Sequence, residues 1–210
     1  LDMALFNARY HFEGRQADRP IYADAPATGI IPGREWLRQR LKARRFLHMV
    51  WMHLYRRDFI EGNAYRFVPR LIHEDVIWTT RALLAAERVR YTGHIAVHYR
   101  IPLRRFTPEQ SQRRLQAIVD SSVVNAEALA TMCATLGNDP ELRRLLADQL
   151  VDGALSVFHK LEKMPDRSIA IATLHRLRRT GFLRLLWQHA GSTPQRRRIA
   201  RHWLRSWLAV

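Results

Sequence analysis

Cysteine is nearly absent from this sequence, because Cys133 is the single cysteine among 210 residues. One thiol can form neither an internal disulfide nor a zinc site built from several cysteines. Long apolar runs are missing as well, since no stretch approaches the roughly 20 apolar residues that cross a bilayer. Apolar residues still make up 47% of the chain, as in an ordinary globular protein. Together these features predict a folded protein without disulfides, in a reducing, cytoplasmic setting.

Acidic residues are scarce relative to basic ones. The chain has 19 Asp and Glu against 35 Lys and Arg, so its formal net charge is +16. From Arg167 to the last residue there are ten Arg and no Asp or Glu. A positive field of this size favours polyanionic partners, namely nucleic acid, anionic lipid head groups or phosphorylated substrates.

The first half of the chain is predicted to mix strands and helices. The apolar spacing predicts strands over residues 3–12, 88–92 and 95–100, and helices over 34–45, 56–62 and 74–86. Residues 13–33 hold three prolines and three glycines among polar residues, so they are predicted to form a loop. The aromatic run over residues 46–55 supports no assignment.

Past residue 105 the pattern becomes helical. Thr107 and Gln110 have the spacing of a capping box, with a proline at the first helical position, and Gly137 is expected to end that helix. Three further helices are expected to start at Asp139, Asp166 and Thr193. We therefore predict an α/β region over 1–105, an all-α basic region over 106–210 and a predominantly helical protein.

Two adjacent carboxylates, Glu74 and Asp75, open the predicted helix 74–86. Their spacing leaves two interpretations open. Acidic residues in a first helical turn stabilise the helix by about 0.3–1 kcal/mol, so both could be simple capping groups. A carboxylate at a helix N-terminus can also stay ionised and accept a proton from a hydroxyl group, as a general base does.

Four blocks, in order over about 55 residues, carry a resemblance to a known family. Residues 50–60 (VWMHLYRRDFI) resemble its Trp-Asn-Lys-Leu-Tyr-Arg block, and residues 67–69 resemble its Phe-Pro step. His73-Glu74-Asp75, followed by Trp78, is similar to its acidic pair and the helix after it. Residues 88–102 resemble its closing pair of strands, which end in Tyr-Arg. Residues 1–105 thus resemble the C-terminal half of a family-2-type inverting glycosyltransferase of the GT-A fold.

The resemblance implies a role for each matching residue. Asp75 matches the base that takes the proton from the acceptor hydroxyl, with Glu74 as its neighbour. The substrate-binding residues implied by the matching blocks are Trp51, His53, His73 and Arg100. Trp51 and His53 match the lining of the acceptor pocket, and Arg100 matches a basic position near the donor diphosphate. From the residues alone, Trp51 could also be a buried core residue, and Arg100 could also be one of the many surface arginines.

A divalent metal, Mg²⁺ or Mn²⁺, is also implied by the resemblance. The family holds it with an Asp-X-Asp motif, and no Asp-X-Asp occurs in this sequence. The metal is therefore expected for the full-length enzyme, with ligands outside this chain. The chain begins at Leu1 within a strand pattern, which suggests a fragment, and Met52-His53 replaces the family's Asn-Lys. We expect the chain alone to be incomplete and inactive.

The last helix, over residues 193–208, is amphipathic. Its apolar positions are Ile199, Ala200, Trp203, Leu204, Trp207 and Leu208, and its charged side carries Arg198, Arg201, His202 and Arg205. This pattern suits a helix lying in a membrane interface and equally a helix docked on its own domain.

The resemblance implies a nucleotide-sugar donor and a glycan or lipid-linked acceptor, as in bacterial surface polysaccharide synthesis. We expect a cytoplasmic protein, with attachment to the inner face of the cell membrane through residues 193–208 as an open alternative. A basic helical protein that binds nucleic acid, or a membrane-surface scaffold, is the rival interpretation. The sequence shows no recognition helix, zinc finger or ribonucleoprotein motif in its support.

Overall fold

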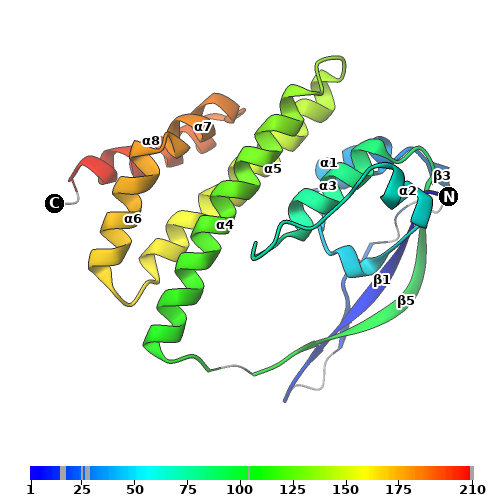
Figure 1. Cartoon of the computed structure of the whole chain (residues 1–210), viewed down its shortest axis with the longest axis horizontal. Helices are drawn as coiled ribbons and strands as arrows, with labels where there is room; N and C mark the ends of the chain where they lie inside the picture. Colours follow the sequence, from blue (N-terminus) through cyan, green and yellow to red (C-terminus); the bar gives the residue numbers. More distant parts are fainter. Residues whose placement is uncertain (15–17, 25, 27–28, 104, 209–210) are drawn as a thin grey trace. The chain divides into compact units, whose positions relative to one another are not determined.

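The computed structural model describes residues 1–14, 18–24, 26, 29–103 and 105–208 (Figure 1). The described chain forms two compact units. The first contains Leu1–Val68 and Asp75–Arg105, and the second contains Pro69–Glu74 and Phe106–Val210. A mixed α/β region is thus followed by a mostly helical one, which confirms the predicted fold class.

Two long parallel strands form the centre of the first unit, β1 (Met3–Phe12) and β5 (Val89–Ile101). Figure 1 shows them side by side along most of their length. The prediction of two separate strands over 88–92 and 95–100 was wrong. A single strand crosses both segments, and its register against β1 shifts at Asn7, so the break in the apolar pattern marks a bulge and not a turn.

Three short strands complete the sheet. They are β2 (Arg19–Pro20), β3 (Ile30–Ile31) and β4 (His53–Tyr55). β2 and β4 pair with β1, and β3 pairs with β5, all antiparallel. β2 and β3 lie inside the segment predicted as loop, and two residues are too few to produce a detectable alternation. Residues 46–55 contain β4 and the 3-10 turn η1 (Val50–Met52).

Helices α1 (Gly33–Lys42), α2 (Arg57–Gly62) and α3 (Asp75–Ala85) agree with the predicted helices of this region. Trp36 of α1 is fully buried and stacks on Tyr91 of β5, with ring centroids 5.3 Å apart. Helices α1 and α3 pack together, and a Cβ on Gly33 would lie 2.3 Å from the Leu83 carbonyl oxygen. Glycine at position 33 therefore permits the close approach of α1 to α3.

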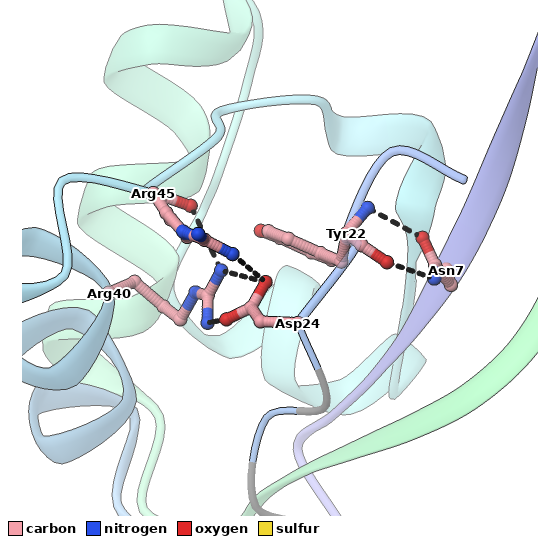
Figure 2. Close-up of polar contacts among 5 residues, drawn as sticks. All are labelled: Asn7, Tyr22, Asp24, Arg40 and Arg45. Atoms are coloured by element: carbon pink, nitrogen blue, oxygen red, sulfur yellow. Dashed lines mark hydrogen bonds and ion pairs between the residues drawn. The ribbon is translucent and has the colours of Figure 1, made fainter. Parts of the chain in front are cut away.

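A buried polar cluster ties the segment after β2 to the sheet and to α1 (Figure 2). The Asn7 side chain donates to the Tyr22 carbonyl and accepts from the Tyr22 amide, both at 2.9 Å. Asp24 forms an ion pair at 2.6 Å with Arg40, whose side chain is only 5% exposed, and a second one with Arg45. The hydrogen bond from Arg40 lowers the pKa of Asp24 to about 2. Burial raises the pKa of Tyr22, under the Arg40 guanidinium, to about 12.

Five helices form the second unit. They are α4 (Pro108–Ala134), α5 (Pro140–Glu162), α6 (Arg167–Arg179), α7 (Phe182–His189) and α8 (Thr193–Leu208). Asp139 and Asp166 cap α5 and α6 as predicted, and Thr107 and Gln110 form the predicted capping box. The core is aliphatic and includes Leu142, Leu146, Leu150, Leu155 and Leu177. No described helix is long and apolar enough to cross a membrane.

Two details of this unit differ from the sequence prediction. Helix α4 ends at Ala134 with Thr135 as its cap, so Gly137 does not end it. Helix α7 was not predicted as a separate element. It begins after Gly181, whose left-handed φ of 82° turns the chain sharply out of α6.

Candidate active site

Asp75 is the first residue of α3 and is half-buried. The helix dipole places partial positive charge at this end, which favours a negatively charged carboxylate there. The turn before it contains Glu74, which is half-buried, and His73, which is exposed. His73 has a left-handed φ of 60°, uncommon for a residue other than glycine. The acidic pair thus lies at a helix start, as predicted.

Two side chains of α4 hold the turn that contains His73. The Ile72 amide donates to Ser121 Oγ at 3.0 Å, and Asn125 Nδ2 donates to the His73 carbonyl at 3.1 Å. Ser121 and Asn125 are buried polar residues one helical turn apart. The sequence analysis missed both, although two buried polar residues four apart within an apolar stripe are a recognisable signal.

Tyr55 of β4 is near enough to Asp75 for the charge of that carboxylate to act on its phenol. Burial is the main cause that raises the pKa of Tyr55 to about 12, and the negative charge of Asp75 adds to it. Hydrogen bonding with the side chains of Thr79 and Trp78 acts in the opposite direction. The phenol therefore stays protonated at neutral pH. Tyr55 lies inside the block that carries the family resemblance, but its role was not predicted.

His53 is joined to this pair through Tyr55. The Nδ1 atom of His53 lies 3.0 Å from the Tyr55 hydroxyl oxygen, within hydrogen-bonding distance. Burial lowers the pKa of His53 to about 3, and the positive charge of His48 contributes to this shift. The imidazole is therefore neutral at physiological pH. His53 is thus within hydrogen-bonding distance of a phenol whose pKa is also raised slightly by the charge of Asp75, and both His53 and Asp75 are predicted site residues.

Aromatic rings surround this arrangement. Trp78 of α3 meets Tyr55 edge-on, with ring centroids 6.0 Å apart, and stacks on Phe67 at 4.2 Å. Tyr65 contacts the same indole at 5.7 Å. Rings packed in this way limit water and lower the local dielectric constant, so the charge of a nearby carboxylate acts more strongly on its neighbours.

Trp51 and Arg100 occupy another part of the first unit. Trp51 stacks on Tyr99 of β5 with centroids 4.9 Å apart, and Tyr99 is exposed. Neighbouring side chains of a strand point to opposite faces, so Arg100 lies on the face away from this stack. Arg100 is exposed and pairs with Glu13 at 3.6 Å. The structure therefore does not bring Arg100 to the Trp51–Tyr99 pair.

Metal ligands do not gather in the part of the chain that the structure describes. No three His, Cys, Asp or Glu side chains among those residues are placed to hold a metal ion. The described residues consequently do not fit the Mg²⁺ or Mn²⁺ ion that the resemblance implies, and no chemical step is derived through it.

Comparison with known proteins relates part of this chain to the glycosyltransferases. The relative is YibD of Escherichia coli strain K12, described as an uncharacterized glycosyltransferase, with 43% identity over 101 residues. The match covers 47% of this chain and 29% of the E. coli protein. No family model matches the chain, and no solved structure matches it. Nearly half of the chain is therefore homologous to less than a third of a glycosyltransferase.

Proposed function

We propose that this chain supplies the acceptor side and the catalytic base of a glycosyltransferase. In the proposed reaction, a sugar moves from a nucleotide-diphosphate sugar to an acceptor hydroxyl with inversion. The observation that carries the proposal is the position of Asp75 in the first turn of α3, from which its charge acts on Tyr55. The partial homology to a glycosyltransferase supports the same class of reaction.

Asp75 acts as the general base in this proposal. Its carboxylate takes the acceptor's hydroxyl proton while that oxygen forms a bond to the anomeric carbon. The bond from that carbon to the donor's phosphate oxygen breaks on the opposite face, and its electron pair leaves with the nucleoside diphosphate. Tyr55 and His53 are both neutral at pH 7, so neither competes for the proton or pairs with the carboxylate as a cation. Their hydrogen bond keeps the phenol in place beside the base.

The remaining predicted residues have supporting roles in the proposal. Trp51, stacked on the exposed Tyr99, offers an aromatic face to the acceptor sugar. Glu74 and His73, which directly precede Asp75 in the sequence, bind the acceptor in this proposal. Arg100 contacts the donor diphosphate. This last role requires Arg100 to leave Glu13, and both side chains are exposed enough for such an exchange.

Several parts of the proposal concern the full-length enzyme. Residues outside this chain would hold Mg²⁺ or Mn²⁺ there, and the ion would supply positive charge next to the donor's diphosphate. The acceptor is a glycan or a lipid-linked glycan of bacterial surface polysaccharide synthesis, handled on the cytoplasmic side of the membrane. Residues 1–105 correspond to the C-terminal half of a GT-A domain. The 210-residue chain by itself should show no sugar transfer.

The test is release of nucleoside diphosphate by the full-length protein that contains these residues, with a panel of nucleotide sugars and a lipid extract as the acceptor source. Asp75→Asn keeps the side chain's size but removes the base, so the transfer rate should fall about 100-fold or more. Glu74→Gln is the matched control, because it makes the same change one residue earlier, and it should cost less than about tenfold.

Circular dichroism of both variants checks that α3 still forms. If sugar transfer survives in Asp75→Asn and disappears in Glu74→Gln, the general base is Glu74 and not Asp75. No release from any nucleotide sugar by the full-length protein would contradict the proposed function itself.

A further inference from the structure

Helix α8 packs on the second unit through a different face from the apolar one that the sequence suggested. The buried side chains of α8 are Gln195, Ile199 and Ser206, and those of His202 and Trp203 are half-buried. His202 stacks on Phe158 of α5 with ring centroids 3.8 Å apart, and burial lowers its pKa to about 4. The assignment of His202 to the charged side was therefore wrong. A neutral imidazole can pack on a ring as an apolar group does, which residue type alone does not reveal.

The tryptophan side of α8 remains exposed as a result. Leu204 is 61% exposed and Trp207 is 64% exposed, large fractions for such apolar side chains. Together with Trp187 of α7 they line an open apolar hollow of about 520 Å³, which we call the indole surface; its residues are Trp187, Ala200, Trp203, Leu204 and Trp207. Since monomeric proteins rarely expose a contiguous apolar patch without a partner, the indole surface marks an interaction site.

Arginine side chains border the indole surface. The Arg178 guanidinium lies 3.9 Å from the centroid of the Trp207 ring, and that of Arg196 lies 5.8 Å from the Trp187 ring. Arg197 and Arg201 are exposed on α8, at the edge of its apolar side. No Asp or Glu occurs from Arg167 to the end of the chain. The surface therefore combines an apolar centre with a border of a single, positive sign.

We propose that the indole surface binds an anionic lipid bilayer, with α8 lying in the plane of the head groups. Tryptophan favours this interfacial depth, because its ring is apolar and its N–H needs a polar partner. The bordering guanidinium groups meet lipid phosphates, so the charges of the two surfaces are complementary. The surface is less suited to nucleic acid. Contacts to the phosphate backbone need cations at the centre of the surface, where Ala200 and Leu204 lie.

This inference goes beyond the proposed sugar transfer, and its test contains no transfer step. The 210-residue chain is sedimented with vesicles of phosphatidylcholine alone and of phosphatidylcholine mixed with phosphatidylglycerol. We expect binding to the mixed vesicles that weakens as salt is added, and at least tenfold weaker binding to the neutral ones. Leu204→Ser with Trp207→Ser should weaken binding to the mixed vesicles tenfold or more. Arg197→Gln with Arg201→Gln should weaken it about fivefold for each arginine.

Matched controls come from the same unit. Ile169→Ser removes an apolar side chain of α6 that is 39% exposed, and Arg113→Gln with Arg143→Gln removes the same charge from α4 and α5. Both controls should change vesicle binding less than twofold. Circular dichroism of every variant confirms that the helices remain.

Three outcomes would overturn the proposal. The first is no binding to mixed vesicles, or binding that Leu204→Ser with Trp207→Ser leaves unchanged. The second is binding of a single-stranded oligonucleotide that these substitutions abolish, without vesicle binding, which would make the surface a nucleic-acid site. The third is a dimer seen by light scattering that the same substitutions dissociate, without vesicle binding, which would make it a contact between copies.

Discussion

The two units of this chain bury different kinds of side chain. The second unit has an aliphatic core, and its ion pairs, such as Arg176 with Asp120, lie at the surface. In the first unit polar and aromatic groups are buried together, including the Asp24–Arg40 pair and the His53–Tyr55 pair. Buried titratable groups with displaced pKa values gather where proteins do chemistry. In the second unit such a group, His202, is engaged in stacking on Phe158, whereas His53 and Tyr55 of the first unit are near predicted site residues. The search for a reaction therefore starts in the first unit, and the exposed indole surface belongs to the second.

The largest expected difference between the units concerns their ion pairs. Asp24→Asn leaves the buried Arg40 guanidinium without its main counter-ion, and should destabilise the first unit by about 3 kcal/mol. Asp120→Asn breaks a half-exposed pair of the second unit and should cost less than about 1 kcal/mol. Hydrogen exchange measured peptide by peptide assigns each loss to its unit.

The control for this comparison is Arg45→Gln, which removes the exposed partner of the same carboxylate. It should cost less than about 1 kcal/mol, because Arg40 keeps its ion pair. Equal losses of unfolding free energy for Asp24→Asn and Asp120→Asn would contradict the expectation that the ion pair with the buried Arg40 stabilises its unit more than the half-exposed pair does.

Local signals made much of the fold predictable. The capping residues Thr107, Asp139 and Asp166 act within three residues of themselves, so the helix starts of the second unit could be read directly. The bulge in β5 and the two-residue strands depend on partners far along the chain, and no short window contains them.

The site was predictable to a similar degree. The acidic pair is a local feature, whereas the electrostatic effect of Asp75 on Tyr55 joins residues from a helix and a strand. The same limit applies to α8. Its apolar positions predict a helix, but the choice between docking through Ile199 and exposing Trp207 depends on Phe158 and the other residues it packs against.

Acid should weaken the Asp24–Arg40 ion pair of the first unit. The pKa of Asp24 is lowered to about 2 by its hydrogen bond to Arg40, so folding favours the charged carboxylate. Its contribution to stability is therefore complete above the ordinary value near 4 and is lost as the pH falls from about 4 toward 2. Over that range the difference in unfolding free energy between the wild type and Asp24→Asn should shrink steadily, as read by hydrogen exchange in α1 peptides. If this difference in unfolding free energy stays constant down to pH 2, the Asp24–Arg40 ion pair does not stabilise the first unit.

The smallest effect should have the opposite sign and occur in the second unit. Gly153 lies inside α5, is exposed, and would place a new Cβ in open space, since nothing lies within 4 Å of that position. Gly153→Ala should therefore stabilise this unit by about 0.5–1 kcal/mol, because alanine loses less backbone entropy than glycine in a helix. Slower exchange confined to α5 and the helices packed on it would confirm the gain.

In the first unit the same substitution at Gly33 would place a Cβ 2.3 Å from the Leu83 carbonyl, and it should speed exchange there. A stabilising Gly33→Ala would show that α1 and α3 are not packed as closely as the buried core of the first unit requires.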